Sequence, residues 1–189
     1  MIGTLSLRDI AIAAGGRVVG SDCQISSVTT DSRKADQNSV FVALKGERFD
    51  AEVFVSDVAK RGASAAVVTK QLPVDIAQII VPDTLKALGA IAKLVRSRFE
   101  YPVIAVTGSS GKTSVKEMLA EMLRSHLGKD EAVLATQGNF NNEIGAPLTL
   151  LRLDPAHRYA VVELGASAVG EFAYTTALTQ PRVALSLIH

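Results

Sequence analysis

Four apolar runs in the second half of the sequence narrow the folds open to this chain more than any other feature. They are PVIAV (102–106), AVLAT (132–136), YAVVEL (159–164) and RVALSLI (182–188). Runs that are apolar throughout, rather than at every second residue, are typical of strands whose two faces are both covered. Helical patterns separate the runs, and this alternation predicts a series of β-α-β units around a parallel sheet.

The segment 1–82 predicts a smaller α/β unit. A helical pattern over 6–14 should end at Gly15 and Gly16. A second helix is expected over 51–63, and short strands are expected at 25–30, 39–44, 64–69 and 77–81. A helix over 83–99, with Asp83 as its N-cap, then leads into the first of the four runs.

Composition and charge exclude several classes of protein. Of the 189 residues, 48% are hydrophobic and 21% are charged, which suits a packed globular core. The net charge is +1 without a basic cluster, so we expect no nucleic-acid partner. The single cysteine, Cys23, fits a reducing compartment. No signal peptide is evident, and no apolar run reaches the roughly 20 residues of a membrane span. We therefore expect a soluble, cytoplasmic protein.

The first apolar run ends in a turn of small residues, VTGSSGKTS (106–114). Such a turn lets backbone N–H groups converge on anionic oxygens, and the helix expected after it adds the positive end of its dipole. Lys112 can contact the β and γ phosphates of a nucleotide, and the Thr113 hydroxyl can bind Mg²⁺. The pattern predicts nucleotide binding by Thr107, Gly108, Ser109, Ser110, Gly111, Lys112 and Thr113.

This turn departs from the usual phosphate-binding pattern, because Val106 stands where that pattern begins with glycine. A shorter T-G-x-x-G-K-T form remains, between an expected strand and an amphipathic helix. Together with the small α/β unit at 1–82, these features predict an α/β fold class. A small N-terminal domain is followed by a P-loop domain with a parallel sheet. A Gly/Ser turn that binds nothing is the alternative.

The helix that follows the turn is expected to turn an apolar side toward the core. That side comprises Val115, Met118, Leu119, Met122 and Leu123.

Two further groups of polar residues accompany the turn. Glu163 ends the third apolar run, and because strand ends of a parallel sheet converge at one edge, its carboxylate can hold Mg²⁺ on a nucleotide. The alternative is an ordinary strand-end glutamate that faces water. Asn139, Asn141 and Asn142 crowd a loop before a helix, either as turn and N-cap residues or as donors to a polar ligand.

Three stretches together closely resemble the Mur ligases, the ATP-dependent amino-acid ligases of peptidoglycan synthesis. They are VTGSSGKTSVKEML, TQGNFNNEIGAPLTLL and YAVVELGAS. Upstream, TTDSRKADQNSVFVALKGERFD is similar to the N-terminal UDP-sugar domain of that family. The resemblance covers essentially the whole chain. It implies a UDP-sugar-binding domain at 1–82 and the first part of a central ATP-binding domain at 83–189.

The resemblance also implies ligands and roles for the site residues. ATP with Mg²⁺ would lie at 108–113, with Lys112 and Glu163 as catalytic residues and with Thr113 and Glu163 as metal ligands. For Arg33 a merely solvated side chain is an equal alternative. The substrate-binding residues implied are Thr136, Asn139 and Asn142 near the nucleotide and the acceptor, and Ser32, Arg33, Lys45 and Gly46 at the UDP-sugar.

The stretch NFNNEIGAP is most similar to the branch of the family that adds D-alanyl-D-alanine to a UDP-N-acetylmuramoyl-tripeptide. In the reaction implied, the γ-phosphate of ATP goes to the terminal carboxylate of the peptide, and the incoming amine displaces phosphate from the acyl phosphate. A sister ligase that adds the third residue, a diamino acid or lysine, is the alternative within the family. A P-loop kinase or a non-catalytic nucleotide-binding module is the alternative outside it.

Two departures from the family pattern limit what can be carried over. Ala51 and Glu52 stand where the family commonly has Gly-His, so no contact is assigned there. The sequence ends at VALSLIH, before the metal-binding histidine, the modified lysine and the C-terminal domain of the family, and His189 is not given that histidine's role. We therefore expect a fragment that keeps the nucleotide loop, cannot complete ligation alone and has an exposed edge at its last strand.

Overall fold

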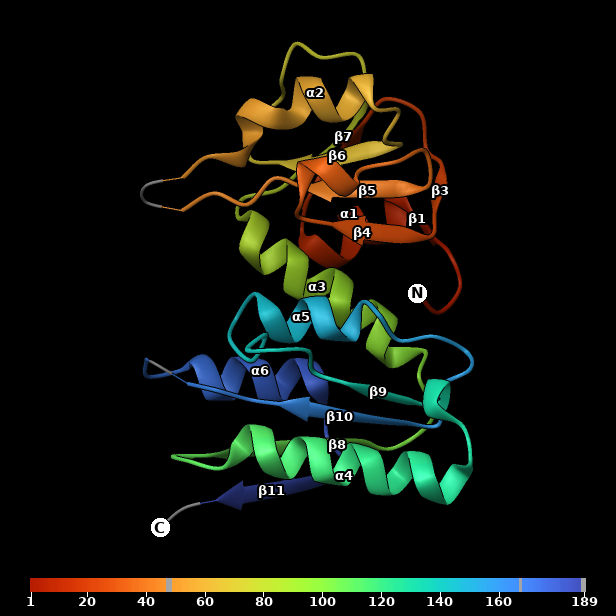
Figure 1. Ribbon diagram of the computed structural model, residues 1–189. Coiled ribbons are helices and arrows are strands. Elements are labelled where there is room, and N and C mark those ends of the chain that lie inside the picture. Colours follow the sequence, from red (N-terminus) through yellow and green to blue (C-terminus); the bar gives the residue numbers. More distant parts are fainter. Residues whose placement is uncertain (47–48, 167, 188–189) are drawn as a thin grey trace. The chain divides into compact units, whose positions relative to one another are not determined.

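The computed structural model describes residues 1–46, 49–166 and 168–187 (Figure 1). The residues Glu47, Arg48, Ser167, Ile188 and His189, which belong to stretches discussed above, lie outside the described ranges. The chain divides into two compact units, here called unit 1 and unit 2. Apart from the first two residues, unit 1 is Gly3–Ile91 and unit 2 is Ala92–His189.

Unit 1 is built on a five-stranded sheet. In spatial order its strands are β2 (Arg17–Val19), β7 (Ala77–Ile80), β6 (Ala65–Val68), β5 (Ser39–Val42) and β4 (Ser27–Thr29). Strands β4 to β7 are parallel, and β2 pairs antiparallel with β7. A second, two-stranded sheet pairs β1 (Leu5–Ser6) with β3 (Gln24–Ile25).

Residues at the ends of the helices of unit 1 determine where these helices begin and end. Helix α1 (Leu7–Ala14) begins in a capping box with Ser6 and ends at Gly15, whose φ of 64° is left-handed, so the predicted stop is confirmed. The helix expected over 51–63 is shorter, because a 3₁₀ turn, η2 (Ala51–Phe54), precedes α2 (Val55–Lys60). Another 3₁₀ turn, η1 (Ser32–Lys34), follows β4.

Helix α3 (Thr84–Ser97) follows unit 1's last strand and begins as the sequence predicts. The Oδ1 atom of Asp83 accepts hydrogen bonds from the amides of Leu85 at 2.9 Å and Lys86 at 3.0 Å. These two amides have no acceptor inside the helix, so the aspartate satisfies them and fixes the point where the helix begins.

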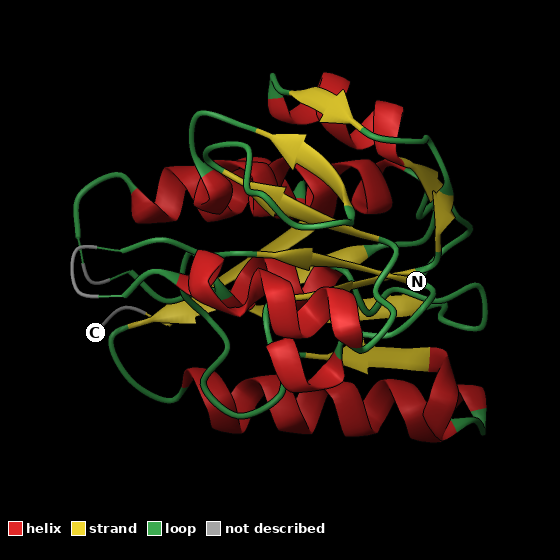
Figure 2. Cartoon of the chain, turned by 90° about the horizontal axis from the view of Figure 1, so that it is seen from above, coloured by secondary structure: helices red, strands yellow, loops and turns green. Residues whose placement is uncertain are grey.

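Unit 2 contains a four-stranded sheet in which all pairs are parallel. In spatial order its strands are β11 (Val183–Leu187), β8 (Val103–Gly108), β10 (Tyr159–Glu163) and β9 (Val133–Ala135). The helices are α4 (Lys112–Leu127), α5 (Gly145–Leu150) and α6 (Glu171–Thr179), with a 3₁₀ turn, η3 (Asp130–Ala132), before β9 (Figures 1 and 2). The expected parallel α/β fold is confirmed.

Helix α4 packs on the sheet of unit 2 with a narrower apolar side than the sequence predicts. Val115, Leu119 and Leu123 pack on Val106, Val161 and other buried sheet residues. Met118 and Met122, by contrast, are 59% and 69% exposed, so their expected place in the core is wrong. The reason is geometric: residues four apart form one stripe along the helix, and the methionines lie beside that stripe.

The last strand of unit 2 is an edge. Strand β11 pairs only with β8 among the described strands, and four of its five residues are exposed, among them Val183 and Leu185. No described helix is both long enough and apolar enough to cross a membrane. In the five-stranded and the four-stranded sheet, the parallel strands all end on the same side of the sheet. Ligand sites of α/β proteins usually lie at these carboxyl ends.

Candidate functional site

The turn after β8 has a backbone that requires glycine at two points. Gly108 has a φ of 142°, and a Cβ atom there would lie 2.2 Å from the carbonyl oxygen of Leu187 in β11. Gly111 has a φ of 77° and stands immediately before α4. Both glycines therefore allow the chain to pass from β8 into the helix while staying close to β11.

Some hydrogen-bond donors of this turn are used within the protein, and others remain available to a ligand. The amide of Ser109 donates to the carbonyl oxygen of Leu187 at 3.1 Å, which commits it to the sheet. The first amides of α4, those of Lys112 and Thr113, have no acceptor within the helix. The Nζ atom of Lys112 donates to the carbonyl oxygen of Gly108 at 2.7 Å, and because an ammonium carries three N–H groups, it keeps donors for an anion.

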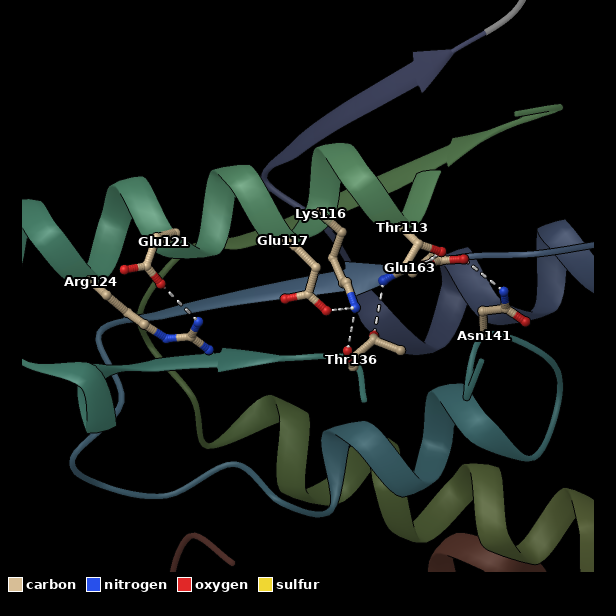
Figure 3. A network of polar contacts seen from close by, with 8 residues as sticks. All are labelled: Thr113, Lys116, Glu117, Glu121, Arg124, Thr136, Asn141 and Glu163. Atoms are coloured by element: carbon tan, nitrogen blue, oxygen red, sulfur yellow. Dashed lines mark hydrogen bonds and ion pairs between the residues drawn. The ribbon is translucent and has the colours of Figure 1, made fainter. Parts of the chain in front are cut away.

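Glu163 lies beside the turn because β10 is the neighbour of β8, with Glu163 opposite Val106. Its side chain does not face water, since the residue is only 2% exposed, and the alternative of a solvated strand-end glutamate is wrong. The Thr113 hydroxyl donates to its Oε2 at 3.0 Å, and the Asn141 Nδ2 donates to its Oε1 at 2.8 Å (Figure 3). The structure therefore brings Thr113 and Glu163 into direct contact.

Thr136 and Lys116 hold the backbone beside Glu163. Thr136 is 1% exposed at the end of β9, and its hydroxyl oxygen accepts a hydrogen bond from the Glu163 amide at 2.9 Å. Its carbonyl oxygen accepts from the Nζ atom of Lys116 at 2.7 Å (Figure 3). Lys116 was not among the sequence candidates, although it follows Thr113 by three residues and so shares its side of α4.

The three asparagines of the loop before α5, Asn139, Asn141 and Asn142, make different contacts. Asn141 contacts Glu163, and its carbonyl oxygen accepts from the Gly165 amide at 2.8 Å. The Oδ1 atom of Asn142 accepts from the Gly145 amide at 2.8 Å, so this side chain satisfies the first amide of α5. Asn139 is exposed and its carbonyl oxygen accepts from the Asn141 amide. Spacing alone left the three asparagines as equal candidates, and the family resemblance named only Asn139 and Asn142. The structure shows that Asn141 is the one bonded to Glu163.

The oxygen atoms around Glu163 fit a magnesium ion that shares its coordination with a nucleotide. Mg²⁺ prefers oxygen ligands and is commonly held by one or two carboxylates together with phosphates and water. No lysine or arginine in the described chain forms an ion pair with Glu163. The described residues also contain no group of three His, Cys, Asp or Glu residues able to enclose a metal.

The candidates for UDP-sugar contact in unit 1 follow two neighbouring strands. Ser32 and Arg33 lie in η1 after β4, and Lys45 and Gly46 follow β5. The Nε and Nη2 atoms of Arg33 donate to the two carboxylate oxygens of Asp31, each at 2.9 Å. These hydrogen bonds, with that from the Arg33 amide, lower the pKa of Asp31 to about 2.

Lys45 is also paired. Its Nζ atom lies 3.0 Å from Oδ2 of Asp50, and this hydrogen bond lowers the pKa of Asp50. Glu52, which the sequence left without a role, is 6% exposed. Its Oε1 accepts from the Thr69 amide at 2.6 Å and from the Thr69 hydroxyl at 2.7 Å, which ties η2 to the end of β6.

Comparison with known proteins connects these features. Residues 106–187 match the Mur ligase middle domain. The UDP-N-acetylmuramoyl-tripeptide--D-alanyl-D-alanine ligase of Escherichia coli (strain K12) is 48% identical over 182 residues, which are 96% of this chain and 39% of that protein. A crystal structure of MurF from Acinetobacter baumannii matches with a TM-score of 0.88 and 40% identity, over 98% of this chain and 41% of that one.

A MurF ligase from Thermotoga maritima, solved in complex with ADP, matches with a TM-score of 0.76 and 32% identity, over 86% of this chain and 37% of that one. The chain spans about 40% of the length of the curated relatives it matches first. The family model spans residues 106–187, and this range contains most of the three motif stretches of the sequence. The chain therefore carries a Mur ligase middle domain in residues 106–187, and over 96% of its length it is similar to about 40% of a Mur ligase chain.

Proposed function

We propose that unit 2 binds the phosphates of ATP together with Mg²⁺. The observation that carries the proposal is the buried carboxylate of Glu163, which accepts from Thr113 beside the glycine turn and forms no ion pair with a described lysine or arginine. A buried carboxylate is costly unless it is paired or binds a metal. A magnesium ion brought by the nucleotide would supply the missing positive charge.

Each residue of the turn has a part in this proposal. Gly108 and Gly111 give the backbone its path, and the free amides at the start of α4 donate to phosphate oxygens. Lys112 adds a charge that is already held over the turn by its bond to Gly108. Thr113 and Glu163 supply oxygen ligands to the metal. The role of ATP in the reaction is to give up its terminal phosphoryl group to a carboxylate.

The activity of the whole protein is proposed from its relatives. We propose an ATP-dependent, cytoplasmic ligase that joins D-alanyl-D-alanine to a UDP-N-acetylmuramoyl-tripeptide. Residues 1–82 would bind the UDP-sugar, with Ser32, Arg33, Lys45 and Gly46 in contact with it. Residues 83–189 would be the first part of the ATP-binding domain, with Thr136, Asn139 and Asn142 near the nucleotide and the acceptor. Arg33 and Lys45 suit a diphosphate, because both are cations at the ends of neighbouring strands.

The proposal for unit 2 is tested by calorimetric titration of this chain with ADP, with Mg²⁺ and with EDTA. We expect binding that Mg²⁺ strengthens, and we expect Lys112→Ala to weaken it roughly 10- to 100-fold, the value of a charge-assisted contact. Lys129→Ala, which removes an exposed lysine just beyond α4, is the matched control and should bind as the unmodified chain does. Absence of ADP binding in Mg²⁺, or equal binding by both variants, would contradict the proposal.

A further inference from the structure

Lys116 is buried without an obvious structural benefit. Its side chain is 0% exposed, and no other lysine or arginine in the described part of the chain is buried. Its Nζ atom donates to Oε1 of Glu117 at 2.6 Å, but the side chain of Glu117 is 57% exposed. Burying an ammonium costs several kcal/mol, and a half-solvated partner offsets only part of that. An apolar residue would pack here at lower cost, so the lysine calls for another explanation.

The second contact of Lys116 leads to the metal site. Nζ donates to the Thr136 carbonyl oxygen at 2.7 Å, and the Thr136 hydroxyl accepts from the Glu163 amide at 2.9 Å. Figure 3 shows this path running from α4 through the end of β9 to the end of β10. Three elements that meet only in the folded chain are thereby joined at one point.

Glu163 is thus connected to α4 in two ways. The direct connection is the bond from the Thr113 hydroxyl to Oε2, and it uses an oxygen atom that a metal would need. The indirect connection through Thr136 reaches the backbone amide of Glu163 and leaves both carboxylate oxygens untouched. The indirect path can therefore keep Glu163 at a fixed distance from Thr113 whether or not the carboxylate binds a metal.

We infer that Lys116 is a positioning residue, which holds Glu163 through Thr136 so that the carboxylate and the Thr113 hydroxyl converge on the nucleotide's Mg²⁺. This inference rests on the proposed nucleotide and metal site. Residues that orient metal ligands from behind commonly change metal affinity 10- to 100-fold when they are replaced. Because Lys116 touches neither the nucleotide nor the metal, its effect should appear in the dependence on Mg²⁺ and not in metal-free binding.

The test measures the Mg²⁺ concentration that half-saturates ADP binding, for the unmodified chain and for Lys116→Met. We expect Lys116→Met to raise it about 10-fold while ADP affinity in EDTA stays unchanged. Lys116→Arg, which keeps a charged donor, should restore most of the Mg²⁺ response. Lys129→Met is the matched control, since it removes an exposed lysine just beyond the same helix.

A second variant breaks the same path elsewhere and keeps the test decisive if Lys116→Met does not fold. Thr136→Val removes the hydroxyl that accepts from the Glu163 amide and conserves the shape of the side chain. It should raise the Mg²⁺ requirement similarly, and the double variant should go little further, because both changes cut one path. An unchanged Mg²⁺ response in either folded variant, with only a lower melting temperature, would overturn the inference. If the unmodified chain shows no Mg²⁺-dependent ADP binding, the proposed site fails first and the inference fails with it.

Discussion

The carboxyl ends of the parallel strands carry candidate site residues of opposite charge and different burial in the two units. In unit 1 the cations expected to meet a ligand, Arg33 and Lys45, are bound to carboxylates of nearby residues, Asp31 and Asp50, at the surface. In unit 2 the charged residue at the strand end is an anion, Glu163, which is buried and contacts neutral donors. Both candidate cations of the first edge are paired, whereas no lysine or arginine in the described part of the chain forms an ion pair with Glu163.

The difference indicates how each edge would respond to a ligand. Exposed ion pairs are worth little in water, so a diphosphate can replace the carboxylates of unit 1 with a small net change in free energy. A buried carboxylate without a cation is a larger cost, and a bound metal removes it. We therefore expect the affinity of unit 2 for its ligand to depend strongly on a divalent ion, and that of unit 1 to depend on it weakly.

The largest expected effect distinguishes two of the predicted site glycines, Gly108 in unit 2 and Gly46 in unit 1. Gly108→Ala places a Cβ atom against the carbonyl oxygen of Leu187 and strains a φ of 142°, whereas Gly46 has open space around it. We expect Gly108→Ala to destabilise unit 2 by about 3 kcal/mol, a fall of roughly 12 to 24 °C in its melting temperature. Gly46→Ala should change stability by about 0.5 kcal/mol or less. Scanning calorimetry measures both, and equal losses would contradict this account of the turn.

The next largest effect tests whether Glu163 binds Mg²⁺. Glu163→Gln removes the negative charge, so Mg²⁺ should bind at least about 10-fold more weakly with ADP, as shown by titration. The melting temperature without ligand should not fall, because an uncompensated buried charge has gone. Glu52→Gln in unit 1 is the matched control, since Glu52 is another buried carboxylate that accepts from a threonine hydroxyl. A similar Mg²⁺ response in the two variants would argue against a metal at Glu163.

A smaller effect concerns the edge of unit 1. Arg33→Gln should weaken the binding of UDP about 3- to 10-fold, because the guanidinium that would bind the diphosphate must first leave Asp31. The affinity of unit 2 for ADP with Mg²⁺ should be unaffected. Titration of the variant with each nucleotide separates the two results. Unchanged UDP binding would favour the solvated role of Arg33.

The smallest effect is on titration. Hydrogen bonds from the Arg33 side chain lower the pKa of Asp31 from 3.8 to about 2, so the stabilising contribution of the pair is present above the unfolded value and is lost as the pH falls toward 2. In carbon NMR the Asp31 carboxyl should titrate near 2, and Arg33→Gln should move its midpoint up toward 3.8. A midpoint already near 3.8 in the unmodified chain would show that the pair does not persist in solution.

Much of the fold and part of the site follow from local sequence. The four apolar runs became the four parallel strands of unit 2, since a strand covered on both faces is apolar throughout. Asp83 and Gly15 set helix ends because the groups they satisfy lie within a few residues. The apolar side of α4 was less predictable, because Met118 and Met122 have the hydrophobicity of core residues and lie beside the packed stripe.

The sequence alone determined the parallel strands, the glycine turn and the residue types that suit a nucleotide, because each depends on patterns within a few residues. The tertiary structure decided which side chains meet. Thr113 and Glu163 are 50 residues apart, Asn141 and Glu163 are 22 apart, and Lys116 and Thr136 are 20 apart. Such contacts depend on strand order and on burial. For that reason only the folded chain distinguishes Asn141 from its neighbours and places Glu163 among neutral donors.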